Sequence, residues 1–523
     1  MRITTRLSLL AAFGAALIGA AALWAVDPEA GSGPLPKLRP ARDTTFLIAP
    51  LDDDGNVDYA AALNEVYGRD VKPEQNGLVG LWQAWGPNAL GEPPAPEYFD
   101  LLGMSRPPDE GKYLVDFSAY VREGSGDDAE LADRLHRQHF DSTEKPWTAR
   151  RQPGIAAWVV SNEAPLAVVA EAVRREKYFR PILHSGPKSG EMLLFAMRAP
   201  ESGLLLELAR LLVFRANLEM GEGRLAAAAE DVLTCRRLGR MIARGPAYDD
   251  AAVGFVVDAY AVDAERTLFR LGGRSTAELR RYLDELKSLG PLPWPGEVFT
   301  RADRYCYLDA VQRIREQKSD AVLAHFPLKT PARATRIDFE AALRSGNYWF
   351  DRVSGARRRL LFDPPRGTAQ LEKLREELTA IRKKFPERDE QEGHAIDRVA
   401  DEDFSDYLLA TFFPDSGLAP FGNFDRWEQE FELSKLAAAL MLFRVERNRY
   451  PATLDELAPA YLKSISHDRY TGAPLVYRIE ADGCVLYSVG PNGHDDGGVN
   501  KTDRLDDLDE RFDDRVVRMT AAP

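Results

Sequence analysis

The chain has 523 residues and a mass of 58.3 kDa, so we expect roughly two to four folded units rather than one core. Hydrophobic residues make up 45% and charged residues 29%, which excludes wholesale disorder and a multi-pass membrane protein. With 68 Lys and Arg against 82 Asp and Glu, the net charge is −14, so a nucleic acid is not an expected partner. Three cysteines without a C-x-x-C spacing exclude a disulfide framework.

The first 26 residues combine a short basic start with a long apolar run. Arg2 and Arg6 precede residues 7–26, which are almost entirely apolar. A run of about twenty apolar residues matches the hydrocarbon layer of a bilayer at the rise of an α-helix. We therefore predict that residues 1–26 are a signal anchor, with a cleaved signal peptide as the alternative.

This leader sets the expected location of the protein. A retained leader makes a single-pass protein of the inner membrane, held through residues 7–26, with its bulk facing the periplasm because the basic start stays cytoplasmic. A cleaved leader makes the same body exported and soluble. Residues 27–44 contain several prolines and no periodicity, so we expect a linker between the leader and the body.

Proline content and apolar periodicity divide the body into regions. Residues 45–153 are repeatedly interrupted by proline, which predicts an irregular, mixed N-terminal region. Residues 154–290 repeat apolar side chains with helical spacing, which predicts a helical domain. Residues 291–423 predict a second helical region, rich in charge. The expected fold class is mainly α.

One pair of predicted helices within residues 154–290 has a distinctive pattern. The helices meet at residues 220–223, which contain two glycines, and small residues such as Ala216 and Ala228 allow close approach. The pair resembles a single tetratricopeptide unit, and that resemblance implies a helical layer that binds another molecule. Arg240 stands where the repeat would have proline, and no second copy follows at the ~34-residue period.

Residues 424–523 combine a long amphipathic helix with a β-hairpin. Residues 424–447 place their apolar side chains on one helical face. Alternating apolar residues at 475–479 and 484–489 predict two strands, and residues 480–483 supply the turn between them. The body is therefore expected to end in a small α+β domain with an acidic tail.

The order of motifs in this region resembles the globular domain of the major pseudopilin of type II secretion. The motifs are Asn448-Arg449-Tyr450-Pro451, Thr471-Gly472-Ala473-Pro474 and Leu486-Tyr487-Ser488-Val489-Gly490. The chain departs from that family because residues 1–26 lack the Gly-Phe-Thr-Leu-x-Glu processing motif and some four hundred other residues precede the domain. A fibre subunit is therefore not expected. As a whole, the chain looks like large exported bacterial proteins that combine these parts, a likeness that carries no known activity.

The pseudopilin resemblance implies a calcium site. In that family a loop after the last strand binds calcium, and residues 490–503 correspond to it. Ca²⁺ takes six to eight oxygen ligands, which a glycine-rich acidic loop can supply. The candidate ligands are Asp495, Asp496 and Asp503. The alternative is an acidic surface loop held by Asx turns.

No sequence motif names a reaction. Ser185 and Lys188 have the S-x-x-K spacing, but Gly186 and Pro187 oppose the helix that this motif requires. Neither G-x-S-x-G nor H-E-x-x-H occurs. We therefore assign no catalytic residue and no cofactor other than the calcium ion.

Two functions remain open from the sequence. The first is a membrane-anchored extracytoplasmic protein without catalytic activity, in which a helical body binds another protein or a component of the cell envelope. The second is an extracytoplasmic hydrolase whose acidic catalytic residues are dispersed in the sequence and converge only in the fold. A buried pair of carboxylates with raised pKa values would favour the hydrolase.

Overall fold

The fold comes from a computed structural model. It describes residues 38–91, 94–142, 145–183, 192–193, 197, 200–290, 299–316, 337–360, 362–385, 399–413, 418, 423–499 and 513–520. Within this part the chain is mainly helical, and its strands form one three-stranded antiparallel sheet near the C-terminus. The predicted fold class, a mainly α protein with a small C-terminal α+β part, is confirmed.

The helices fall into two groups along the chain. The N-terminal and central helices are α2 (Tyr59–Gly68), α3 (Gly77–Trp85), α4 (Pro96–Leu102), α5 (Phe117–Ser125), α6 (Ala129–Asp141), α7 (Pro153–Ser161), α8 (Glu163–Ala172), α10 (Ser202–Gly221), α11 (Leu225–Ile242), α12 (Tyr248–Leu271) and α13 (Thr276–Ser288). The later helices are α15 (Arg304–Glu316), α18 (Phe339–Leu360), α19 (Pro364–Arg382), α20 (Phe404–Phe412) and α21 (Asn423–Arg447). A π-helical turn, Phe299–Asp303, leads into α15.

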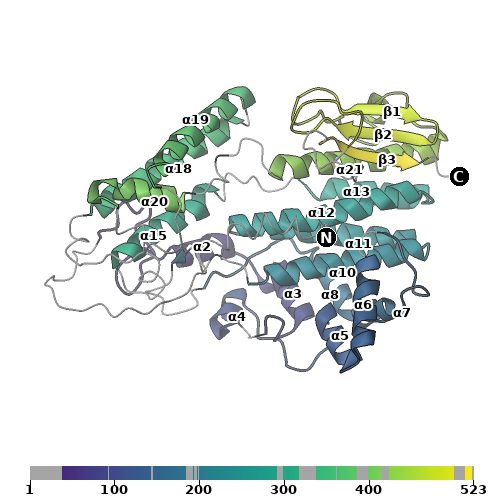
Figure 1. The fold of residues 1–523 in the computed structure, drawn as a ribbon, viewed down its shortest axis with the longest axis horizontal. Helices are drawn as coiled ribbons and strands as arrows, with labels where there is room; N and C mark the ends of the chain where they lie inside the picture. The colour runs from purple at the N-terminus through teal and green to yellow at the C-terminus, as the bar shows by residue number, and fades with distance from the viewer. Residues whose placement is uncertain are drawn as a thin grey trace.

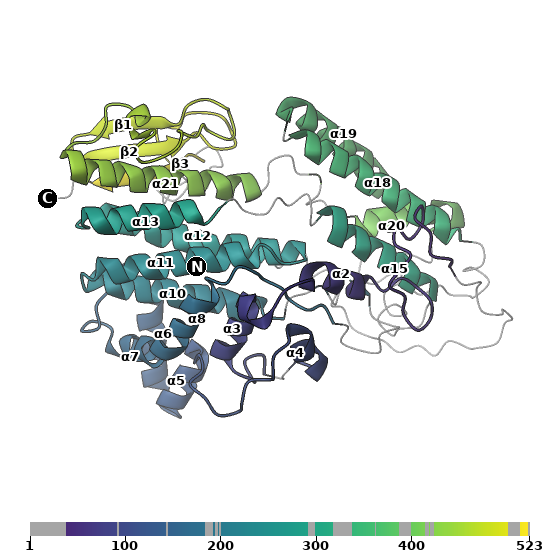
Figure 2. The same ribbon diagram turned by 180° about the vertical axis from the view of Figure 1, so that it is seen from behind.

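Two large hydrophobic cores hold these helices together. One core contains side chains from Leu78 to Met519 and joins most of the N-terminal helices, α10 to α13, α21 and the sheet. The other joins α2, α15, α18, α19 and α20. Figures 1 and 2 show the same division, with α15 and α18 to α20 gathered at one end of the molecule.

Helices α10 and α11 form the predicted helical hairpin and pack along α12. Two glycines explain how closely α11 and α12 approach. A Cβ atom on Gly254 would lie 2.5 Å from the carbonyl oxygen of Gly239, and one on Gly239 would lie 2.7 Å from that of Gly254. Only glycine fits both positions at this crossing, because a side chain on either would meet the opposite backbone.

The C-terminal unit consists of α21 and the strands β1 (Val476–Glu480), β2 (Gly483–Ser488) and β3 (Arg515–Thr520), in the order β1-β2-β3. The hairpin of β1 and β2 was predicted within a residue of its bounds, with Val476 opposite Tyr487. The third strand was not predicted, because its residues were assigned to the acidic tail. It pairs antiparallel with β2, so that Ser488 lies opposite Arg515.

Helix α21 lies between the sheet and the helical body (Figures 1 and 2). Most of its apolar residues are buried, and Leu433 and Leu440 are 0% exposed. Acidic residues of α21 are buried as well: the Glu430 carboxylate accepts a hydrogen bond from Arg266 of α12 at 2.6 Å. The sheet is thus joined to the body through a helix that is covered on both sides.

A buried ion cluster joins four helices at this junction. Arg236 of α11 is 0% exposed. Its guanidinium donates to Asp258 at 3.0 Å and to Glu265 at 2.6 Å, both on α12. It also donates to the hydroxyl of Ser434 on α21 at 2.6 Å. The Tyr282 hydroxyl of α13 donates to the other oxygen of Glu265. Because buried charges need such partners, this cluster requires all four helices to pack in one arrangement.

The predicted leader, residues 1–26, and most of the predicted linker lie outside the described residues. Among the residues that the structure does describe, no single helix has the length and hydropathy of a membrane span, while α7 and α8 pass together as a pair bent by 52°.

Candidate metal centre

The acidic loop lies beside the start of the third strand. Residues 489–499 follow β2, and the pairing of β3 with β2 returns residues 513 and 514 to the same edge of the sheet. Gly490 has φ = 73°, and a Cβ atom there would lie 2.5 Å from the carbonyl oxygen of Asp513. A glycine at this position therefore lets the loop and the strand meet.

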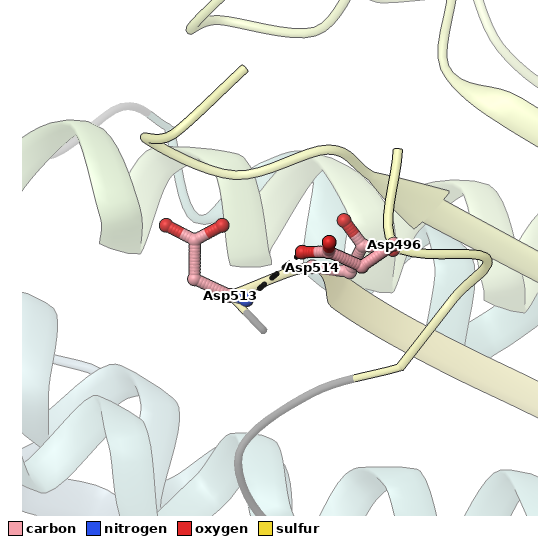
Figure 3. A group of neighbouring side chains, drawn as sticks. All are labelled: Asp496, Asp513 and Asp514. Carbon is pink, nitrogen blue, oxygen red and sulfur yellow. Dashed lines mark hydrogen bonds between the residues drawn. The ribbon is translucent and has the colours of Figure 1, made fainter. Parts of the chain in front are cut away.

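Three carboxylates gather where the two segments meet. One oxygen from each of Asp496, Asp513 and Asp514 lies within 4.8 Å of the others. The Asp513 N–H donates to the Asp496 carboxylate at 3.4 Å, as the dashed line in Figure 3 marks. In that view the carboxylates of Asp496 and Asp514 lie together, and the Asp513 carboxylate extends to one side. The side-chain amide of Asn492 donates a hydrogen bond to the Asp496 carboxylate at 3.3 Å.

Asp514 is the least ordinary member of the group. It is 0% exposed, and one carboxylate oxygen accepts the Gly498 N–H at 2.8 Å. Its other oxygen, Oδ1, is buried without a hydrogen-bond partner among the described residues. Burial raises the pKa of Asp514 to about 6. Hydrogen bonds from the backbone of Gly498 and Asp496 oppose this rise, and the negative charges of the Asp496 and Asp495 carboxylates add to it. A carboxylate in this setting is stabilised by a proton or by a cation.

The predicted ligands are placed in three different ways. Asp496 belongs to the group of three carboxylates. Asp495 is not a member: its Oδ1 accepts the Tyr487 hydroxyl and the Gly497 N–H, both at 2.8 Å. The second of these bonds is an Asx turn, so local support also exists for the alternative of a loop held by Asx turns. Asp503 lies outside the described residues.

Asp513 and Asp514 were not predicted as ligands, because their region was assigned to the acidic tail. The alternation of Val517 and Met519 with Arg518 was a signal for a strand that could have found them. A strand there, paired with β2, returns the two aspartates to the acidic loop.

Two arginines hold the glycines of the loop in place. Arg478 of β1 donates to the Tyr487 hydroxyl at 2.9 Å and to the carbonyl oxygen of Gly497 at 3.0 Å. Arg518 of β3 donates to the carbonyl oxygen of Gly498 at 2.7 Å. The arginines thus fix the loop backbone from the sheet, and the carboxylates remain as the main oxygen donors for an ion.

The chemistry of this donor set fits a hard cation. Three carboxylates offer six oxygens, all of the kind that Ca²⁺ prefers, and a loop lets them converge without the constraint of a helix. The set contains no imidazole and no thiolate, which zinc and copper sites usually use. The buried Oδ1 of Asp514 is the observation that points to an ion, because a cation supplies the partner that this oxygen lacks.

Comparison of the chain with protein-family models, with curated proteins and with solved structures finds no match in any of the three.

Proposed function

We propose that this protein is a membrane-anchored, extracytoplasmic binding or scaffold protein whose C-terminal domain is stabilised by calcium. The observation that carries the proposal is the buried, unpartnered oxygen of Asp514 beside Asp496 and Asp513. The pseudopilin resemblance of residues 424–523 supports the same ion at this loop. The leader predicted at residues 1–26 supports the location, since calcium is abundant outside the cytoplasm and scarce within it.

The packing of α21 favours a binding role over a role as a fibre subunit. Helix α21 is covered by the sheet on one side and by α12 and α13 on the other, so it is not available to pack into a fibre. The protein instead holds the sheet and its acidic loop on a stable helical support. We propose that this support presents a surface to another protein or to a component of the envelope.

Thermal melting of the full chain tests the metal. Calcium that binds only the folded state at a hundred times its Kd adds about 2.7 kcal/mol to the free energy of unfolding. We expect calcium to raise the melting midpoint by a few degrees and a chelator to reverse the rise. Asp514→Asn should remove most of the response, whereas Asp482→Asn, an exposed acidic residue of the β1–β2 turn, should retain it. An unchanged midpoint in wild type would remove calcium from the proposal.

The location and the partner need experiments in cells. External protease should digest the body of the protein in spheroplasts. Without protease, the intact protein should fractionate with membranes. A mature chain that begins near Leu23 and is free in solution would refute the anchor. Crosslinking in intact envelopes, followed by identification of the captured molecule, tests whether a protein or another envelope component is bound.

The alternative of a hydrolase is supported by one further observation. Asp303 ends the π-helical turn before α15, and such turns are frequent at functional sites. Burial raises the pKa of Asp303 to about 7, Asp249 of α12 raises it further, and Arg357 of α18 opposes the rise. Its Oδ2 is buried and has no hydrogen-bond partner in the described part of the chain. A carboxyl group that titrates near neutral pH can serve as a general acid.

A substrate screen distinguishes the two functions. If the protein is a hydrolase, activity on a panel of ester, peptide and glycoside substrates should fall at least a hundredfold in Asp303→Asn. The control Asp284→Asn, an exposed residue of α13, should keep full activity. Activity that is equal in both variants would exclude Asp303 as the catalytic acid.

A further inference from the structure

The most exposed large apolar side chain in the described part of the chain lies at the end of a two-helix arm. Helices α18 and α19 run side by side and are joined by a turn that contains Phe362, which is 87% exposed. The next most exposed is Phe140, at 65%. Figures 1 and 2 show the two helices as a pair set apart from α10 to α13.

Contacts at the other end of the arm show that the turn is its tip. Arg382, at the end of α19, donates to the carbonyl oxygens of Ala410 and Phe413, in and just after α20. At the start of α18, the rings of Phe339 and Phe404 lie 5.6 Å apart. The base of the arm is therefore anchored on α20. The turn lies about thirty ångströms away, because α18 has 22 residues and an α-helix rises ~1.5 Å per residue.

The tip is basic although the protein is acidic. Arg358, Arg359 and Arg366 flank Phe362 and are exposed. None of the three forms an ion pair with a residue that the structure describes. The acidic residue of the turn, Asp363, caps α19 by accepting the Arg366 N–H. Three unpaired arginines on a chain of net charge −14 therefore make a local positive end.

An aromatic ring among arginines at a convex tip suits the surface of a lipid membrane. Phenylalanine partitions into the boundary between headgroups and acyl chains, and arginine binds anionic headgroups. The tip is too small for a stable protein interface. Such an interface buries more than ~1,000 Å² of surface, and one phenylalanine side chain supplies at most ~250 Å². We propose that the tip of the α18–α19 arm, formed by Phe362, Arg358, Arg359 and Arg366, binds the surface of an anionic lipid membrane.

This proposal goes beyond the proposed function and does not use the leader or the calcium site. The tip is a second contact, at which the folded body itself touches lipid. If the leader is retained, the tip sets the orientation of the body on the membrane. If the leader is cleaved, the tip provides weak, reversible attachment that depends on anionic lipid and on salt.

Site-specific fluorescence on the full chain tests the contact. The three native cysteines are buried, so an introduced exposed cysteine can carry an environment-sensitive fluorophore selectively. The probe position is Phe362→Cys, and the control is Tyr348→Cys on the same arm, a residue that is 60% exposed. Both variants contain the same leader, so leader insertion alone affects them equally.

We expect vesicles of phosphatidylglycerol to shift the emission at position 362 to shorter wavelength, with quenching by nitroxide-labelled lipid. Phosphatidylcholine vesicles should give no shift, and position 348 should stay unchanged on both. The reversal Arg358→Glu with Arg359→Glu should weaken the vesicle response at least tenfold while the circular dichroism spectrum stays native. No shift at position 362, or equal shifts at 362 and 348, would overturn the proposal.

A second probe keeps the native phenylalanine. Ala369→Cys lies on the exposed surface of α19 near the tip and leaves Phe362 in place. Its response to phosphatidylglycerol vesicles should be lost when Phe362→Asp is added. A response that survives this change would show that the ring does not touch lipid. Protection of position 362 in intact envelopes without any vesicle response would indicate a protein partner and would equally refute the lipid contact.

Discussion

Removal of Arg236 tests whether the buried ion cluster holds the body and the C-terminal unit together. The guanidinium is 0% exposed and serves Asp258 and Glu265, which are 0% and 1% exposed, as well as the Ser434 hydroxyl. Arg236→Met keeps much of the volume but leaves two carboxylates buried without their cation. Breaking a buried ion pair from one side costs about 3–5 kcal/mol. Since one arginine serves two acids here, we expect the upper part of that range.

Urea denaturation of the full chain, followed by circular dichroism at pH 7, measures this loss. The control is Arg281→Met on α13, which removes an exposed ion pair with Glu230 and should cost at most about 1 kcal/mol. Adding Asp258→Asn and Glu265→Gln to Arg236→Met should restore part of the stability, because the two acids then carry no charge. The restoration is partial because the buried Arg240 and Arg274 lose the negative charges of Asp258 and Glu265. A loss equal to that of Arg281→Met would refute the reasoning.

Two further predictions concern the metal and the helix crossing. Calcium affinity should fall as the pH drops through about 6, because a proton on Asp514 competes with the ion. Calorimetry at pH 6 in buffers of different ionisation enthalpy should detect the proton that is released on binding. Identical affinities at pH 5 and pH 7.5 would contradict this prediction. Gly254→Ala should lower the free energy of unfolding by about 1–3 kcal/mol, since its Cβ would press on the backbone of α11. The control is Gly203→Ala, where the structure places nothing within 4 Å of the added Cβ. It should be neutral or stabilising in the same urea titration. Equal effects of the two substitutions would show that α11 and α12 can separate without loss.

Local patterns in the sequence were sufficient for the secondary structure of the best-defined segments. The α10–α11 hairpin follows from apolar residues with a helical period around a glycine turn, and the β1–β2 hairpin follows from two short runs rich in apolar residues on either side of residues 480–483. Both hairpins depend on residues that are close together in the sequence. The mainly α fold class was predictable for the same reason, because it sums local preferences over many residues.

The candidate site was only partly predictable. Asp496 was predicted because the loop after β2 corresponds to the calcium loop of the pseudopilin family that residues 424–523 resemble. Asp513 and Asp514 reach it only through the pairing of β3 with β2, a contact between distant segments that composition does not reveal. The burial of Asp514, which makes the carboxylate group unusual, is likewise a property of the packed sheet and loop.

Tertiary structure alone decided how charged residues are used. The sequence of α21 places Glu428 on its polar face, which predicts exposure to water, yet Glu428 is buried against Arg240 of α11. Glu430, three residues before Leu433 on the apolar side, is buried against Arg266 of α12. Arg236, four residues after Val232 and seven after Ala229, lies on the apolar face of α11 and is completely enclosed. Helical periodicity tells which residues share a face, whereas the number of neighbours that surround a helix is set by packing. A polar face is buried wherever another helix offers opposite charges at the right distance.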